Sequence, residues 1–162
     1  MTPDLLAEVM EATWPALSRH QLGPFTLRDG AGGGKRVSAA SCDGPFTEAD
    51  LAAVEAAMAQ PLMLIREGDT ALDAALDARG WRIIDPVVAY AAPVTALIAE
   101  LPGLTAFPHW PPLEIARSLW AEGGIGPARI AVMDRVTGAK AALLGRTGDR
   151  PAGVAFVACH GA

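Results

Sequence analysis

The chain has 162 residues, of which 51% are hydrophobic and 19% charged. This composition is that of a globular protein rather than a disordered one, with apolar side chains enough for one core or two half-sized units. Thirteen basic and eighteen acidic residues give a net charge of −5 without a basic stripe, which argues against nucleic acid and against an anionic membrane surface.

Targeting and metal-binding signals are missing from the sequence. The first residues, MTPDLLAEVMEATWPAL, carry acids where a signal peptide carries positive charge, and no stretch approaches about 18 uninterrupted apolar residues. Cys42 and Cys159 lie far apart without a CxxC spacing or clustered histidines, which predicts neither a disulfide framework nor a metal site. We therefore predict a soluble, cytoplasmic protein without a bound metal.

The first half of the chain begins with a helix. Thr2 and Pro3 are typical of a helix start, and Pro15 disturbs the face of four apolar side chains that follows (Leu6, Met10, Trp14 and Leu17). Residues 25–28 and 36–41 then read as two strands of a hairpin, joined by a glycine-rich turn.

Two helices and a strand come next. Thr47 and Asp50 are spaced as a helix N-terminal capping pair, and a second helix is expected from Asp69 to Gly80. Between these helices, the apolar run PLMLIREG at 61–68 predicts a strand buried on both faces. Residues 81–93, WRIIDPVVAYAAP, are expected to be extended.

The second half follows a proline-rich segment at 93–112, interpreted as a linker with a short helical piece. A helix is expected after Pro111 and Pro112, with Gly123 as its stop. Three strands are then predicted, at 128–135, 140–146 and 151–161, the last two joined by a tight turn. These elements suggest two units at 1–95 and 113–162 with a linker at 96–112.

The glycine run before Lys35 raises the question of a phosphate-binding loop. A Walker loop needs glycine six positions before the lysine and Ser or Thr after it, whereas the chain has Asp29 and Arg36 there. A dinucleotide fingerprint would open a helix, but this run lies between two predicted strands. A hairpin turn with Lys35 in solvent is the interpretation we favour.

Several stretches of the first half resemble a known family. GPFTLRDGAGGGKRVSAAS, FTEADLAAVEAAM, PLMLIREG and LDAALDARGWRIIDPVVAY, with its Gly80-Trp81 pair, are similar in kind and order to the degenerate first unit of double-domain proteins of the GNAT superfamily, the acetyl-CoA-dependent acyltransferases. The second half, IARSLWAEGGIGPARIAVMDRVTGAKAALLGRTGDRPAGVAFVACHG, resembles the opening of a catalytic GNAT domain, with Pro151 to Val154 in the place of the family's "pvG".

The resemblance implies a fold and an activity. The fold is α/β (α+β), a GNAT-like mixed and mainly antiparallel sheet flanked by helices. The activity is N-acyl transfer from acetyl-CoA, the co-substrate, to a small-molecule amine or a protein amino group. The first unit resembles the later half of that fold and the second its opening half, so one pseudo-domain in permuted order is one arrangement we consider.

The family holds the coenzyme pyrophosphate in an R-x-x-G-x-G/A turn at a helix N-terminus, and no such motif occurs here. The nearest stretch by order is SCDGPFT at 41–47, where Asp43 is negative and Pro45 removes an N–H, and Glu48 and Asp50 add negative charge to the helix turn after it. We therefore expect a non-catalytic first unit, a second unit that stops one strand short of its cofactor loop, and weak coenzyme binding. The alternative function is a catalytically silent GNAT-like module that binds a ligand or a partner.

Few side chains suggest chemistry by themselves. Trp110, Trp120 and Phe156 are the candidates for the wall of an acceptor pocket, although such aromatic residues are more often core. His109 is a candidate base, with His20 and His160 weaker, and a linker histidine is the favoured interpretation. Three candidate nucleophiles have no recognisable base nearby in sequence (Ser38, Ser41 and Cys42). Finally, the apolar last strand would leave an open sheet edge, which predicts self-association through it.

Overall fold

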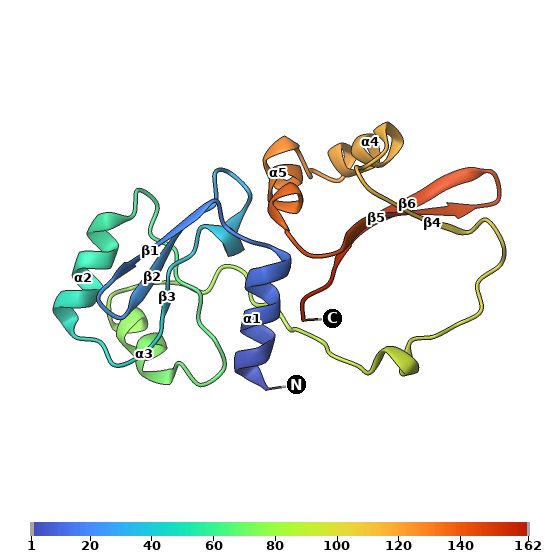
Figure 1. The fold of residues 1–162 in the computed structure, drawn as a ribbon. Coiled ribbons are helices and arrows are strands. Elements are labelled where there is room, and N and C mark those ends of the chain that lie inside the picture. The colour runs from blue at the N-terminus through green and yellow to red at the C-terminus, as the bar shows by residue number, and fades with distance from the viewer. Residues whose placement is uncertain (1, 162) are drawn as a thin grey trace. The chain divides into compact units, whose positions relative to one another are not determined.

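The computed structural model describes residues 2–161 and has a mixed α+β fold, as predicted. Five α-helices and two separate three-stranded antiparallel sheets occur in this part of the chain (Figure 1). The chain divides into two compact units, unit 1 with residues 16–91 and unit 2 with residues 2–15 and 92–161.

The sheet of unit 1 is built around its central strand. β1 (Ser18–Leu22) and β2 (Phe25–Asp29) form an antiparallel hairpin, and β3 (Ser41–Cys42) pairs with the other edge of β2. Gly23 has φ +57 in the turn between β1 and β2, a conformation that glycine adopts readily. Sequence reasoning missed β1 because its residues are polar and exposed.

The expected strand at 36–41 is mostly a helical turn. Lys35–Val37 form the 3-10 helix η1, because the amides of Ser38 and Ala39 both bond to the carbonyl of Lys35. Gly30 lies against this turn, where a Cβ would meet the side chain of Val37 at 2.8 Å. Close packing of the loop on η1 therefore leaves only Ser41–Cys42 extended as a strand.

Two helices cover the apolar face of this sheet. α2 (Glu48–Ala57) begins at Thr47 and α3 (Thr70–Ala78) at Asp69, as predicted, and Gly80 follows α3 with φ +80. Their inward side chains and those of the strands make the core of unit 1 (Phe25, Leu27, Ala40, Cys42, Leu51, Val54, Leu72 and Leu76). At 61–68 the expected strand is reduced to one parallel bridge between Ala40 and Met63.

Unit 2 contains the second sheet, in the order β4 (Ala106–His109), β5 (Lys140–Thr147) and β6 (Arg150–Ala158). The predicted tight turn joins β5 to β6, with Gly148 at φ +62. β4 lies within the segment expected to be linker, where sequence reasoning saw only prolines and a helical piece. That helical piece is present as the 3-10 helix η2 (Val94–Ala96).

Three helices belong to unit 2. α1 (Pro3–Thr13) starts at the expected Thr2 cap, and α4 (Glu114–Glu122) ends at the expected Gly123. α5 (Pro127–Arg135) replaces the strand predicted at 128–135. The buried residues of α5 are Ile130, Val132 and Met133, and Ile130 and Met133, three apart, lie on one face of the helix.

Two expectations about organisation are corrected. The opening helix was expected in the first unit, 1–95, but α1 groups with unit 2, where Trp14 packs on Phe156. The permuted pseudo-domain is wrong, because among residues 2–161 no strand of 18–42 pairs with a strand of 106–158. The strand pairing of each sheet therefore lies within one unit.

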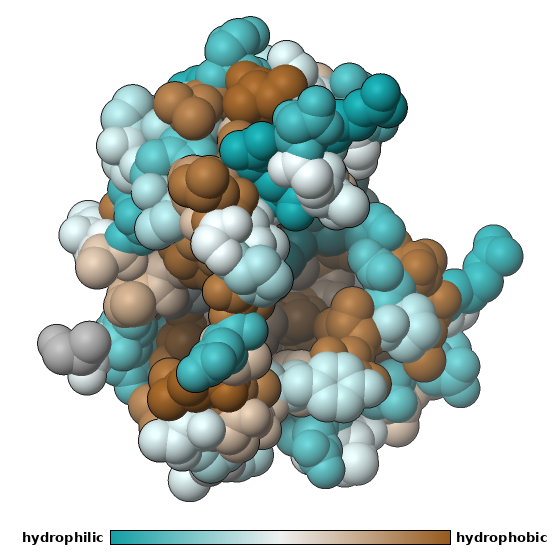
Figure 2. Space-filling model, turned by 90° about the vertical axis from the view of Figure 1, so that its right-hand side faces the viewer, coloured by the Kyte–Doolittle hydropathy of each residue, from teal (hydrophilic) through white to brown (hydrophobic). Residues whose placement is uncertain are grey.

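Residues 82–93, which the sequence predicted to be extended, form no helix or strand. Their large hydrophobic side chains are open to solvent; Val87 is 77%, Val88 74% and Tyr90 92% exposed. Figure 2 shows one face of the molecule on which hydrophobic (brown) residues are open to solvent among hydrophilic (teal) ones. Within residues 2–161, no helix is both long enough and apolar enough to span a membrane.

Candidate functional site

The three residues predicted to wall a pocket lie in one aromatic cluster of unit 2. The ring of Phe156 on β6 stands edge-to-face with Trp110, with centroids 5.7 Å apart, and with Trp14 of α1 at 5.9 Å. Trp120 of α4 belongs to the same cluster but is only 4% exposed. Trp120 thus packs as core, while Trp110 and Phe156 keep part of their surface open.

Trp110 is held from one side by a cation. Lys140 Nζ lies 4.7 Å from the centroid of the Trp110 ring. The same ammonium donates to the carbonyl oxygens of Met133, Asp134 and Val136 at 2.7 to 3.0 Å. These carbonyls end α5, where a positive charge is favourable to the helix dipole. Lys140 therefore fixes both α5 and the indole ring.

His109 is the titratable side chain beside this cluster. It ends β4 and pairs in register with the fully buried Ala142. Its Nδ1 lies 3.0 Å from the carbonyl oxygen of Phe107, and because a carbonyl can only accept, Nδ1 is the donor. Nε2 is buried and has no hydrogen-bond partner among the described residues. A neutral ring would thus present an unused acceptor in the interior of unit 2.

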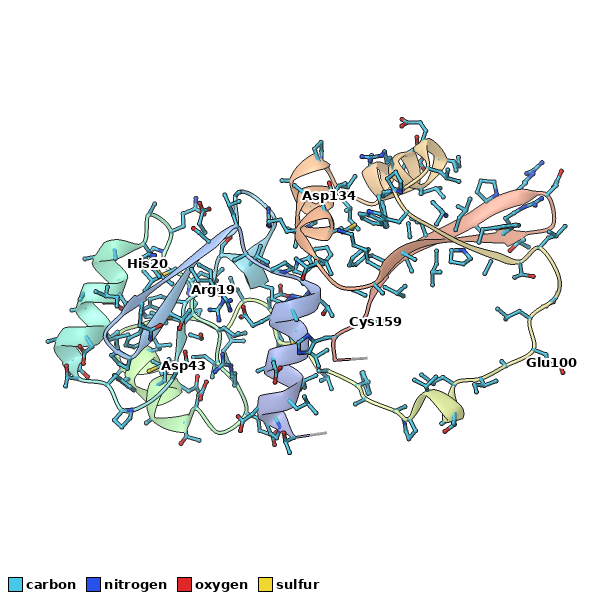
Figure 3. The ribbon with its side chains drawn as sticks, in the orientation of Figure 1. Arg19, His20, Asp43, Glu100, Asp134 and Cys159 are labelled. Atoms are coloured by element: carbon cyan, nitrogen blue, oxygen red, sulfur yellow. The ribbon has the colours of Figure 1, made fainter. Side chains whose placement is uncertain are left out.

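The other two histidines lie apart from the cluster centre. His20 is an exposed residue of β1 in unit 1, labelled in Figure 3. His160 follows β6, and its Nε2 lies 2.8 Å from Oε1 of Glu8 on α1. This contact ties the end of β6 to the opening helix and gives His160 a structural role.

The start of α2 is the place nearest by order to the family's pyrophosphate turn. Thr47 Oγ1 accepts from the amide of Asp50, and the carboxylate of Asp50 accepts from the amide of Thr47, which completes a capping box. The hydrogen bond from the Thr47 side chain is the main cause that lowers the pKa of Asp50. Two amides at this helix start are therefore already used, that of Thr47 by the carboxylate of Asp50 and that of Asp50 by the hydroxyl of Thr47.

Asp43 adds a second negative charge before α2. Its carboxylate accepts from Arg66 at 2.9 Å and from Thr26 at 2.9 Å. Burial acts to raise the pKa of Asp43, but these hydrogen bonds outweigh it, so that the pKa lies below its ordinary value. Figure 3 labels this side chain. An ionised Asp43 opposes a pyrophosphate here, in agreement with the expectation from the sequence.

The nucleophile candidates of unit 1 are engaged in local hydrogen bonds. Ser38 donates to the carbonyl of Gly34 at 3.0 Å, and Ser41 Oγ accepts from Arg28 at 3.0 Å. Cys42 Sγ lies 3.2 Å from the carbonyl oxygen of Gly44, and burial is the main cause that raises the pKa of this thiol. A raised pKa keeps the thiol protonated, which lowers its reactivity as a nucleophile.

The glycine-rich loop does not present its lysine as a phosphate ligand. Lys35 Nζ lies 3.2 Å from Oδ2 of Asp85. The loop itself is closed by Asp29, whose carboxylate accepts from the amide of Ala31. Lys35 begins a 3-10 helix of three residues rather than an α-helix with a strong dipole.

Comparisons of the chain with protein-family models, with curated proteins and with solved structures found no match. Within residues 2–161, no group of three or more His, Cys, Asp or Glu side chains could hold a metal ion. Sequence reasoning missed Trp14 as a member of the aromatic cluster, since it placed the opening helix in the other unit. The spacing of Leu6, Met10 and Trp14 on one helix face was the signal that this residue packs on a core.

Proposed function

We propose that the protein is a GNAT-type N-acyltransferase that moves an acetyl group from acetyl-CoA to an amine. The observation that supports this most is the β5–β6 hairpin of unit 2, in which Pro151 to Val154 follow Arg150 at the start of β6 and which has α4 before it. The helix and the hairpin agree with the resemblance carried by residues 115–161, whereas α5 lies where that resemblance expected a strand. Unit 1 adds the capped α2, the bridge at Met63 and α3 with Gly80 and Trp81 after it.

In this proposal the acceptor binds in unit 2. Trp110 and Phe156 offer partly exposed aromatic surface, which suits the apolar part of an amine substrate. Unit 1 acts as a non-catalytic partner domain, because the start of α2 is capped and flanked by Asp43 and Glu48. A cytoplasmic location follows from the proposed use of acetyl-CoA. The expected self-association through the last strand remains a prediction.

The second candidate function is a catalytically silent module of the same fold that binds a ligand or a partner. The observation that favours it is the capping box of Thr47 and Asp50, which uses two of the amides at the helix start and places a carboxylate there. The two functions differ in one measurable property. An acyltransferase must bind acetyl-CoA and release the free thiol of CoA, and the silent module need do neither.

The deciding experiment is calorimetric titration of the folded chain with acetyl-CoA, with desulfo-CoA and adenosine diphosphate as controls. Weak but saturable binding, followed by release of CoA thiol when a panel of primary amines is added, is the result we expect. The variant Trp110→Ala should then raise the KM for the amine and leave the KM for acetyl-CoA unchanged. His20→Ala, at an exposed position of unit 1, serves as the matched control.

Absence of acetyl-CoA binding by a chain shown to be folded would overturn the acyltransferase and leave the silent module. Binding without thiol release on any amine would support a coenzyme-binding module instead. An equal effect of Trp110→Ala on both KM values would show that the aromatic cluster supports the fold rather than the acceptor.

A further inference from the structure

β6 lies at the edge of its sheet although its sequence is that of an interior strand. After Arg150 it consists only of proline, glycine and apolar residues, so that both of its faces are apolar. Natural edge strands are protected by charges, bulges or a covering segment. The order β4–β5–β6 leaves one edge of β6 without a neighbouring strand among residues 2–161.

A second segment of the chain is apolar like a buried strand but belongs to no sheet. Residues 87–91, VVAYA, lack the apolar–polar alternation of a half-exposed strand and would suit a strand buried on both faces. They pair with no strand in the described part of the chain. Their side chains are exposed, Tyr90 most of all. Contiguous exposed apolar surface of this kind marks an interaction site in a soluble protein.

We propose that two copies of this chain associate by strand exchange, in which Val87–Ala91 of each copy adds as a fourth strand to the open edge of β6 in the other. The exchange is reciprocal, so both open edges and both unpaired segments are satisfied in one closed dimer. The backbone groups of β6 bond to the added strand, as in other cases of β-augmentation.

The two elements match in length and in face. Five residues of the segment fit within the nine residues of β6. Val154 and Phe156 pair with the buried Leu144 and Ala142 and so lie on the helix-covered face, while Ala155 and Val157 lie on the open face. Because the added segment is apolar throughout its length, it places apolar side chains beside those of β6 on both faces of the sheet in either register.

The size of the contact is sufficient for a stable dimer. Burying three side chains of the segment (Val87, Val88 and Tyr90) together with Ile83 and Ile84 just before it removes on the order of 300 to 500 Å² of apolar surface. Counting the facing strand and both halves of the exchange, the buried surface is on the order of 1,200 to 2,000 Å², within the range of specific interfaces. The segment itself carries no charge, and only Arg82 and Asp85 lie just before it, so little repulsion opposes the contact.

The test is the mass of the 162-residue chain in solution, measured by light scattering on a size-exclusion column over a dilution series. We expect a dimer that dissociates on dilution. The double variant Val88→Lys with Tyr90→Lys should be monomeric with an unchanged circular dichroism spectrum, because both side chains are exposed. The matched control, Val94→Lys with Leu97→Lys, changes two equally exposed residues outside the segment and should remain dimeric.

A second measurement locates the contact. Chains carrying Tyr90→Cys and chains carrying Ala155→Cys, each with Cys159→Ser, are mixed and oxidised. Disulfide-linked pairs between the two kinds of chain are expected, and Val94→Cys in place of Tyr90→Cys should give none.

Three results would overturn the proposal. A wild-type chain that is monomeric at every concentration removes the dimer itself. Loss of the dimer in both lysine variants would mean that association depends on the hydrophobicity of the whole exposed region and not on the pairing of residues 87–91 with β6. A ladder of larger species in place of a dimer contradicts closed reciprocal exchange.

Discussion

Arg79 and Glu55 form a two-point ion pair that joins the helices of unit 1. Nε of Arg79 lies 3.2 Å from Oε1 of Glu55, and Nη2 lies 2.7 Å from Oε2. Trp81 donates its indole N–H to the same Oε1 at 2.8 Å while its ring packs on the core. The carboxylate on α2 therefore anchors both the residue that ends α3 and the Gly-aromatic pair after it.

Replacing Trp81 with Phe should destabilise unit 1 by about 1 kcal/mol, because the apolar ring is kept and the hydrogen bond to Glu55 is lost. Urea unfolding followed by circular dichroism measures this change. In the Glu55→Gln background the same replacement should cost less, since the charged acceptor is gone. Equal costs in both backgrounds would mean that the indole N–H does not interact with the carboxylate.

The pair also predicts a pH dependence of stability. The hydrogen bond from Arg79 lowers the pKa of Glu55 in the folded protein, with a smaller contribution from Trp81. A lowered folded-state pKa means that the stabilisation is complete above the unfolded-state value of about 4.3 and is lost as the pH falls through the folded-state pKa. The stability difference between wild type and Glu55→Gln should therefore shrink below about pH 4. A difference that stays constant down to that region would contradict the assignment.

Local signals in the sequence predicted the helices well where a cap and a period agreed. Thr47 with Asp50, and Gly80 in the left-handed conformation, lie where the pattern placed them. Asp69 precedes α3 as expected, but its carboxylate accepts from the amide of Arg66 instead of capping the helix. Cap positions follow from a few neighbouring residues, which is why the sequence is informative there.

The strands were harder to predict because their partners are distant. β4 contains Pro108 and is a strand only because it pairs with β5, more than thirty residues later. The same lack of information applies to the candidate site. Trp110 and Phe156 were pocket candidates because of their residue type alone, whereas their edge-to-face contact depends on the sheet that joins β4 to β6.

Lys140 should be a determinant of the stability of unit 2. Lys140→Met removes three hydrogen bonds to the carbonyls that end α5 and the cation over Trp110, and we expect a loss of about 2 kcal/mol. Lys140→Arg keeps the charge and should lose less. Thermal and urea unfolding of both variants provide the comparison, and similar losses in the two would show that the ammonium contacts contribute little.

The two thiols should differ strongly in reactivity. Cys159 is exposed, whereas Cys42 is buried and burial raises the pKa of its thiol. We expect one thiol per native chain to react rapidly with Ellman's reagent, and the second only after unfolding in urea. Cys159→Ser should abolish the rapid phase and Cys42→Ser should leave it intact. A rapid phase from Cys42 would mean that the core of unit 1 opens readily.

Gly124, between α4 and α5, is required for its backbone conformation rather than for space. Its φ is +77, and a Cβ built there would contact nothing within 4 Å, so Gly124→Ala introduces only the strain of the left-handed region. We expect a loss of about 1 kcal/mol in the free energy of unfolding.

Gly103 is the matched control, because it also has open space around a Cβ but no positive φ. Gly103→Ala should be neutral or slightly stabilising, since alanine restricts the unfolded chain without straining the folded one. Equal effects of the two substitutions on urea unfolding would show that the loop after α4 relaxes to accommodate a side chain.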